Sequence, residues 1–400
     1  MRTIYLDNNA TTRIAPEVFD EMLPYLKDLY GNPSSMHTFG GQLHRKVEEA
    51  RGRVAALINA ESEEIIFTSC GTESDNTALM SAVESYPRKR HVITSKVEHP
   101  AVLNFCKHLS RKGLRVTFLP VDTMGRLDMD AFAKALDDDT CVSSVMYANN
   151  ETGVVFPIQA IGEMLRERNV PFHSDAVQAV GKVSIDVKKL PVDMLTISGH
   201  KLHAPKGIGA LYVRKGTRFY PYIIGGHQER GRRGGTENVA SIVGFGKACE
   251  LAKSHLSGEV DHVRGLRDRL ESALLANCPS ARINGDAKSR LPNTTNISFE
   301  YVEGEAILLR LDEYGICASS GSACTSGSLE PSHVLRAMGV SYTAIHGSVR
   351  LSLSRYNEDA DIDTVIEVLP PIIKELRSLS PYGKEELRQF ISGQCTPLSS

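Results

Sequence analysis

Short apolar segments alternate with helical patterns between residues 60 and 215, and this alternation limits the possible folds more than any other feature. The apolar segments are rich in Val, Ile and Leu, as strands buried on both faces should be. Helical patterns, such as those at 72–83 and 157–169, separate some of them. This order predicts an α/β domain with a mostly parallel sheet of seven strands, at 63–69, 90–95, 114–121, 141–149, 170–174, 193–198 and 208–214.

The second half of the chain has a different pattern. A helical segment at 254–276 leads away from the α/β region, and strands and helices follow it without the regular order of the first half. We therefore expect a large α/β domain over residues 15–254 and a smaller α+β domain made of residues 1–14 and 255–400.

Charge and cysteine content exclude several classes of protein. The net charge of −2 gives no general electrostatic reason to expect nucleic acid or acidic membranes as partners. The first 13 residues lack the apolar core of a secretion signal, and no apolar run approaches the ~18 residues needed to cross a bilayer. The eight cysteines contain no C-x-x-C pair, which argues against a zinc ribbon. We expect a cytoplasmic protein whose cysteines are free thiols.

Polar residues follow the ends of several predicted strands. Open α/β sheets bind their ligands beyond the carboxyl ends of the strands, so these residues are the first candidates for a site. They supply hydroxyl, imidazole, amide, carboxylate and amine groups that one cleft could collect. The candidates are Gly71, Thr72, His99, Asn150, Asp175, Gln178, Ser198, His200 and Lys201.

Individual candidates also have structural explanations. Thr72 can be the N-cap residue of the helix that follows it, and Asp175 can cap the next helix. His99 lies directly before a proline and can be a turn residue, while Lys201 can be a surface lysine. The position of all these side chains after strand ends favours a shared site over coincidence.

Pyridoxal phosphate is the cofactor whose chemistry requires this set of groups. It needs a lysine for its Schiff base and an acidic partner for its pyridinium nitrogen, and Lys201 and Asp175 can fill these roles. Its phosphate suits a helix N-terminus, such as the one predicted after the first strand. His200 and His203 form an H-x-x-H pair, but no nearby carboxylate or cysteine completes a ligand set, so we expect no metal site.

Two further candidates lie in the second half of the chain. Cys324 is part of the segment SSGSACTSGS at 319–328, which is too polar to bury a cysteine. Structural cysteines are usually buried, and a flexible spacer does not need a thiol. Cys324 is therefore a candidate nucleophile. Arg350 lies in SVRLSLS on the face opposite Val349 and Leu351, where an arginine can bind a carboxylate through two hydrogen bonds. An ordinary exposed strand arginine is the alternative at this position.

Several segments match a known pattern: YLDNNATTR, GNPSSMH, FTSCGTESDN, VEHPAV, ANNETG, SDAVQAVGK, SGHKLHAPKGIG, GRRGGTEN and SSGSACTSGSLEPSHVLRAMG. In this order, over about residues 3–380, they resemble the cysteine desulfurases of the NifS/IscS type, which are pyridoxal phosphate enzymes of the class V aminotransferase family. The resemblance implies the aspartate-aminotransferase-like fold (fold type I). It also implies that the smaller domain carries a mobile cysteine loop at about 319–330.

The resemblance further implies a reaction and residue roles. Sulfur is removed from L-cysteine, which leaves L-alanine and a persulfide on Cys324, and supplies iron–sulfur cluster assembly, with a scaffold protein as the acceptor. Lys201 would carry the cofactor, His99 would stack on its ring and assist proton transfer, Asp175 would bind the ring nitrogen, and Gln178 the ring hydroxyl. The phosphate would be held by Gly71, Thr72, Ser198, His200 and, from the other subunit of a homodimer, Thr236; the substrate carboxylate would be held by Asn150 and Arg350.

Three alternatives fit parts of this pattern. An aminotransferase or another lyase on the same fold would share Lys201 and Asp175 but would not need Cys324 in a loop. A selenocysteine lyase would use the same residues. A non-catalytic scaffold protein is a third possibility, and the intact set of residues argues against it.

Overall fold

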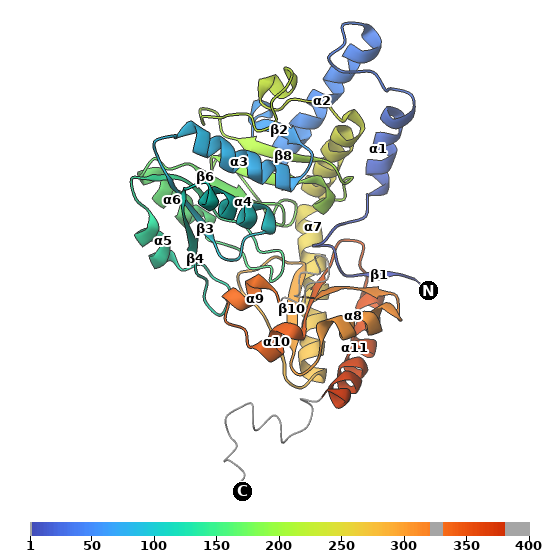
Figure 1. Cartoon of the computed structure of the whole chain (residues 1–400). Helices are drawn as coiled ribbons and strands as arrows, with labels where there is room; N and C mark the ends of the chain where they lie inside the picture. Colours follow the sequence, from blue (N-terminus) through green and yellow to red (C-terminus); the bar gives the residue numbers. More distant parts are fainter. Residues whose placement is uncertain (1, 321–330, 381–400) are drawn as a thin grey trace.

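The computed structural model describes residues 2–320 and 331–380. Its central feature is a seven-stranded sheet of order β2-β8-β7-β6-β5-β3-β4 (Figure 1). Neighbouring strands are parallel, except that β8 is antiparallel to β2 and β7. The strands are β2 (Ile65–Thr68), β3 (His91–Ser95), β4 (Arg115–Leu119), β5 (Thr140–Ser144), β6 (Phe172–Asp175), β7 (Met194–Ser198) and β8 (Gly209–Val213). Each overlaps a predicted strand, so the predicted α/β fold with a mostly parallel seven-stranded sheet is confirmed.

Helices cover both faces of this sheet because successive strand residues point to opposite sides. Ile66 and Val92 belong to a hydrophobic cluster with α3 and α4 on one face. Ile65 and Ile93 belong to a larger cluster with α1, α2, α6 and α7 on the other face. The helices of this region are α1 (Pro16–Lys27), α2 (Thr38–Leu57), α3 (Gly71–Ser85), α4 (Pro100–Arg111), α5 (Met129–Ala135) and α6 (Ile158–Glu167).

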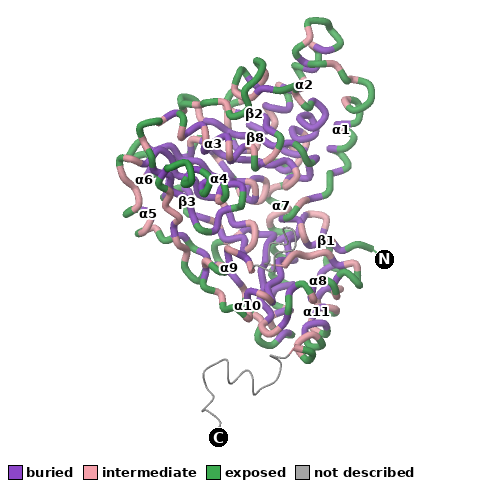
Figure 2. Tube along the Cα trace, in the orientation of Figure 1, coloured by how far each residue is buried: buried purple, intermediate pink, exposed green. Residues whose placement is uncertain are grey.

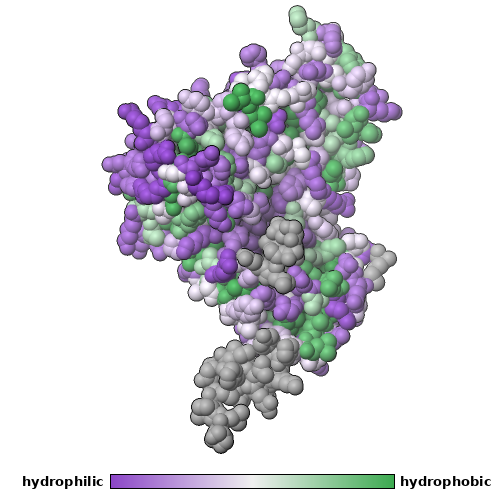
Figure 3. Space-filling view, in the orientation of Figure 1, coloured by the Kyte–Doolittle hydropathy of each residue, from purple (hydrophilic) through white to green (hydrophobic). Residues whose placement is uncertain are grey.

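The outer helices are amphipathic. In α6, for example, Ile158, Ile161 and Leu165 recur at helical spacing and are buried against the sheet. The faces of α4 and α6 that point away from the sheet carry mainly hydrophilic side chains, which gather on the left side of the molecule in Figure 3. Within residues 2–320 and 331–380, no helix is both long and apolar enough to cross a membrane.

A second sheet lies in the lower part of Figure 1. It has the antiparallel order β12-β13-β10-β9, and a separate parallel pair joins β1 to β11. The strands are β1 (Ile4–Tyr5), β9 (Ala281–Ile283), β10 (Thr294–Phe299), β11 (Ile316–Cys317), β12 (Ser319–Ser320) and β13 (Ser348–Ser352). The helices are α8 (Gly304–Asp312), α9 (His333–Ala337), α10 (Tyr342–His346) and α11 (Asp359–Leu379), of which α8 and α11 share a hydrophobic cluster with β10 and β13.

Helix α7 (Val239–Asn277) connects the two sheets and is the longest helix of the described chain. Its N-terminal half, up to Ala252, belongs to the cluster of the seven-stranded sheet, and its C-terminal half, from Val263, belongs to the cluster of the second sheet. Figure 2 shows buried residues along much of it. The domain boundary that we expect at residues 254 and 255 falls inside α7, between these two halves, and the division into two domains remains our proposal.

Candidate active site

A cavity of about 300 Å³ lies at the carboxyl ends of the central strands and is closed on one side by β13 and the N-terminal segment. Of the predicted site residues that the structure describes, all except Thr236 line it. Cys324 lies outside the described residues. The lining residues from the prediction are Gly71, Thr72, His99, Asn150, Asp175, Gln178, Ser198, His200, Lys201 and Arg350.

The start of α3 forms one end of the cavity. Cys70 occupies the N-cap position without a capping side-chain hydrogen bond, so the first backbone N–H groups of α3 are available to an anion. The hydroxyl of Ser198 is buried nearby and has no hydrogen-bond partner. A Cβ atom at Gly71 would come within 3.0 Å of Val177 and 3.5 Å of Ser198, so only glycine leaves this end open. These features fit a phosphate group.

Asp175 ends β6 at the base of the cavity and is only 6% exposed. Its Oδ1 accepts a hydrogen bond of 2.9 Å from the N–H of Val177, and Oδ2 is left to meet a ligand. Burial raises the pKa of this carboxyl, while His99 and Lys201 lower it. The protonated ring nitrogen of a bound pyridoxal phosphate would supply the positive charge that a buried carboxylate requires.

His99 begins α4 and is exposed to the cavity. Its Nδ1 accepts a hydrogen bond of 3.2 Å from the N–H of Ala101, so the neutral ring carries its proton on Nε2. Desolvation lowers the pKa of His99, Asp175 opposes this effect, and Lys201 adds to it. The lowered pKa favours the neutral ring, and Nε2 is the atom at which His99 can exchange a proton.

Lys201 ends a short 3₁₀ turn after β7. Its Nζ donates hydrogen bonds to the backbone oxygens of Asn9 (2.5 Å) and Ala10 (2.6 Å). Desolvation, together with the positive charge of Arg350, lowers the pKa of Lys201 to about 8. Because the neutral amine is the form that attacks a carbonyl carbon, burial prepares this lysine to bind an aldehyde cofactor.

Arg350 lies in β13 and is only 8% exposed, so the alternative of an ordinary exposed strand arginine is wrong. Its Nη2 donates to Asp7 Oδ1 at 2.7 Å, and its Nη1 donates to the backbone oxygen of Asn150 at 3.0 Å. Its Nε is buried and has no partner. The Nε–H group of this cavity-lining arginine thus lacks a protein acceptor among the described residues, which fits a carboxylate ligand.

Three of the purely structural explanations are also wrong. Thr72 is not the N-cap residue, because that position belongs to Cys70. Asp175 caps no helix, since the residues after it form a turn. Lys201 is part-buried and hydrogen-bonded rather than a surface lysine. His99 does begin a helix, and this structural role is compatible with its place in the cavity.

Thr236 is exposed and lies apart from the main cavity of its own chain. It lines another cavity of about 190 Å³ together with Glu229 and Arg233. Three ion pairs hold residues 229–233 of this segment: Glu229 with Arg51 at 2.6 Å, Arg230 with Glu48 at 3.1 Å, and Arg233 with Glu73 of α3 at 2.8 Å.

Sequence reasoning missed three polar residues of the site. Asn9 offers its backbone oxygen to both Lys201 and Gln178, and Asp7 pairs with Arg350. Asp75, one helical turn after Gly71, is buried; its Oδ1 accepts no hydrogen bond from the described part of the chain, with the Nε2 of His173 3.6 Å away, and burial together with Asp175 raises its pKa. Asp75 could have been found from its i+4 spacing from Gly71, which places both residues on one face of α3. Asn9 and Asp7 could not be found by the rule used for the other candidates, because they follow no strand of the large sheet.

Comparisons with known proteins agree with this geometry. The chain matches the model of the class-V aminotransferases over residues 4–365. It is 62% identical to a cysteine desulfurase from Trichormus azollae over 386 residues, which are 96% of each protein. A solved NifS-like protein superimposes with a TM-score of 0.89 and 39% identity, covering 94% of this chain and 100% of that one. SspA in complex with cysteine gives a TM-score of 0.78 at 35% identity, covering 88% of this chain and 99% of that one.

Proposed function

Because the chain belongs to the class-V aminotransferase family and is a cysteine desulfurase of the NifS type, we propose that Cys324 takes up the sulfur of L-cysteine and that the cavity at Lys201 activates this substrate. The observation that carries the proposal is the meeting of an amine, an imidazole, a carboxylate, an anion-binding helix start and an arginine in one cavity. No single strand or helix supplies this combination.

Pyridoxal phosphate is the cofactor of this family, and the residues present fit it. The start of α3, Thr72, Ser198 and His200 would hold its phosphate, as their open N–H groups and the unpartnered hydroxyl of Ser198 allow. Asp175 would bind the ring nitrogen and Gln178 the ring oxygen. When bound, the cofactor withdraws electrons from the α-carbon of an amino acid that is joined to it.

The protein side chains would bind the substrate and move its protons. Arg350 and Asn150 would hold the carboxylate of L-cysteine, because both line the cavity and the Nε of Arg350 has no protein acceptor within the described residues. With a pKa of about 8, the amine of Lys201 exists partly in its neutral form and can accept the α-proton. His99 would exchange a proton at Nε2, since Nδ1 is already bonded to the backbone.

Sulfur transfer itself would occur between two sulfur atoms. Cys324, as a thiolate, would form an S–S bond with the substrate sulfur while the C–S bond of the substrate breaks, with the bonding electrons remaining on the carbon side. A proton added to that carbon completes L-alanine, and the persulfide remains on Cys324. The thiol of free cysteine has a pKa of ~8.5, so a neighbouring base such as His99 would favour the reactive thiolate.

Several finer points belong to the same proposal. Thr236, which is exposed in its own chain, would reach the phosphate of a second subunit in a homodimer. An iron–sulfur scaffold protein would accept the sulfur, in a cytoplasmic setting. Selenocysteine would bind the same residues as cysteine, so a selenocysteine lyase is the second candidate, whereas an aminotransferase would have no use for Cys324.

A mass spectrum taken after addition of L-cysteine tests the nucleophile. We expect the wild-type protein to gain one sulfur atom on the peptide that contains Cys324 and to release alanine. Cys324→Ala should keep the visible absorbance of the cofactor and its change on adding cysteine, but should form no persulfide and no sulfide. Cys317→Ala, which removes a thiol whose pKa is raised by burial, is the matched control and should remain active. Normal sulfide release by Cys324→Ala would refute the proposal.

A further inference from the structure

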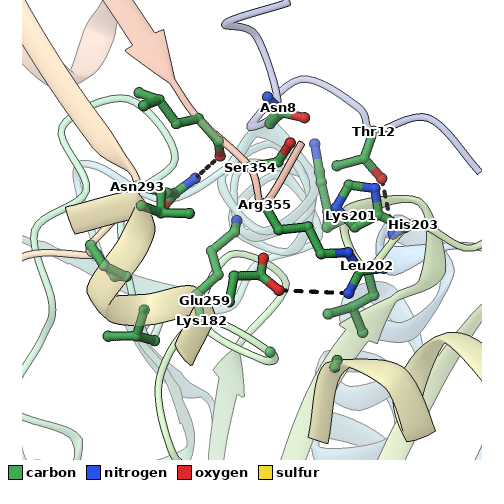
Figure 4. Close-up of a pocket in the computed structure, with 16 residues that line it drawn as sticks. Asn8, Thr12, Lys182, Lys201, Leu202, His203, Glu259, Asn293, Ser354 and Arg355 are labelled. Atoms are coloured by element: carbon green, nitrogen blue, oxygen red, sulfur yellow. Dashed lines mark hydrogen bonds and ion pairs between the residues drawn. The ribbon is translucent and has the colours of Figure 1, made fainter. Parts of the chain in front are cut away.

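A second, smaller cavity lies beside Lys201, on the side away from the start of α3. It has a volume of about 30 Å³, enough for one water molecule, and Lys201 lines both cavities. Figure 4 shows the side chains of Lys182 and Lys201 extending into it from two different segments, next to Glu259 and Arg355. Lys182 does not line the main cavity and has no role in the reaction described above.

The hydrogen bonds of Lys182 fix the orientation of a neighbouring amide. Its Nζ donates to Oε1 of Gln178 at 2.9 Å, and the Nε2 of Gln178 donates to the backbone oxygen of Asn9 at 3.0 Å. An ammonium group can only donate hydrogen bonds, so the oxygen of the Gln178 amide must face Lys182. The nitrogen of this amide therefore faces Asn9 and the main cavity, where it can only donate.

The positive charge of Lys182 has little direct compensation. Its two acceptors are neutral amides: Gln178 at 2.9 Å and, at 3.5 Å, the side chain of Asn9. The carboxylate in the same cavity, Glu259, forms an ion pair with Arg355 at 3.6 Å. Burying an amine without a direct carboxylate partner is unfavourable, so a role at the site would explain its presence.

Charged groups on several elements surround Lys182. Burial, together with the positive charges of Lys201 and Arg350, lowers its pKa to about 7, and Glu259 opposes this effect. The titratable and charged groups that face it are Lys201, Arg350, Glu259, His200, His203 and Arg355.

We propose that Lys182 is a positioning residue of this site: it holds the amide of Gln178 with its nitrogen toward the ring oxygen of the cofactor, and the hydrogen bond that Gln178 then donates strengthens cofactor binding. The inference rests on the proposed function, because it assigns a task to Gln178. A donated hydrogen bond from Gln178 stabilises a negatively charged ring oxygen.

Two substitutions separate the hydrogen bond from the charge. Lys182→Gln removes the charge but keeps a donor for Gln178, whereas Lys182→Met removes both. In the cofactor-loaded protein, the visible absorbance followed against pH reports the protonation of the nitrogen that joins Lys201 to the cofactor. We expect Lys182→Met to raise the midpoint of this titration by about one pH unit, because a ring oxygen without its donated hydrogen bond favours the proton on that nitrogen, and Lys182→Gln to leave the midpoint unchanged.

The affinity for pyridoxal phosphate, measured by fluorescence on reconstitution, reports the second part of the proposal. We expect Lys182→Met to bind the cofactor about tenfold more weakly, as loss of one oriented hydrogen bond predicts, and Lys182→Gln to bind it as the wild type does. Lys189→Met, which removes a lysine whose side chain is 85% exposed, is the matched control and should change neither measurement.

The outcomes distinguish this inference from the proposed function. If the wild-type protein shows no visible cofactor absorbance, the proposed function is wrong. If the wild type has this absorbance but Lys182→Met titrates at the wild-type midpoint, Lys182 does not direct a hydrogen bond of Gln178 to the ring oxygen. Equal cofactor affinity in Lys182→Met and the wild type would refute the role in orienting Gln178. Lys182→Arg, which keeps the charge and a donor, serves as a second variant if Lys182→Met does not fold.

Discussion

Replacement of Arg350 by methionine should weaken binding of L-cysteine by more than the loss of one ion pair. In the native site the guanidinium lies against Asp7, with its Nη2 2.7 Å from Oδ1. Removing it deletes the partner of the substrate carboxylate and also exposes that carboxylate to the negative charge of Asp7. A site that is neutral as an Arg–Asp pair thereby becomes negatively charged.

The two contributions can be approximated separately. A charge-assisted hydrogen bond to the substrate is worth about 1.5–3 kcal/mol, or about 10- to 150-fold in affinity. Two carboxylates on opposite edges of one guanidinium lie about 6 Å apart, and at an effective dielectric constant of about 20 they repel each other by about 3 kcal/mol, or about 100-fold. Arg350→Met should therefore raise the dissociation constant of L-cysteine by about 10³- to 10⁴-fold.

A second substitution isolates the repulsion. Asp7→Asn removes the charge but keeps an oxygen that can accept the 2.8 Å hydrogen bond from Ser319. The double variant Arg350→Met/Asp7→Asn should therefore recover about 100-fold of the lost affinity. Dissociation constants are measured from the visible absorbance of the cofactor-loaded Cys324→Ala protein, which should bind cysteine without releasing its sulfur.

Cysteamine is the control ligand, because it has the amine and thiol of cysteine but no carboxylate. Its affinity should change by less than about threefold in either variant, and any change reports effects of Arg350 on Lys201 rather than on the carboxylate. If the double variant binds cysteine no more tightly than Arg350→Met, Asp7 does not repel the substrate and the reasoning is refuted.

Two other predictions concern buried charges. Arg51→Met should destabilise the protein by about 3–5 kcal/mol in urea unfolding, because it leaves the carboxylate of Glu229, whose side chain is 3% exposed, without its partner. Arg51→Met/Glu229→Gln should recover part of this loss, and equal stability of the two variants would contradict the explanation. Burial raises the pKa of Glu98 from 4.5 to about 8, so between these values the folded state binds one more proton than the unfolded state. Stability should therefore fall as pH rises through this range, by up to about 1.4 kcal/mol per pH unit, and Glu98→Gln should flatten the dependence; an unchanged slope between pH 5.5 and 7.5 would disprove it.

The location of the site at the ends of the strands could be predicted, because parallel strands place their carboxyl ends at one edge of a sheet. His99, Asp175 and Lys201 follow three different strands, and the rule that ligands bind at this edge brings them together without any knowledge of loops. Period 2 alone predicted that Arg350 lies on the face opposite Val349 and Leu351, which belong to the second hydrophobic cluster, but it left an exposed strand arginine as an alternative to a site role.

Other features left no periodic signal. Residues 239–249 of α7 are buried on nearly all sides, so they show no amphipathic pattern, and the sequence predicted only the helix from residue 254. The strand predicted at 141–149 ends at Ser144. The N–H of Met146 donates to the side chain of Glu98 instead of a strand partner, and no local pattern predicts such a contact.

The N-terminal segment explains why the site needs both parts of the fold. Leu6 is buried in the cluster of the second sheet and Ala15 in that of the large sheet, so the residues between them must cross from one to the other. Asn9, in the middle of this crossing, donates to Thr294 and to the backbone of Asn150, and accepts from Lys201. The carbonyl that holds the reactive amine is thus fixed by β10 and by a loop of the large sheet at once. A shift of one part against the other would move this carbonyl, and would thereby change the distance between Lys201 and Arg350.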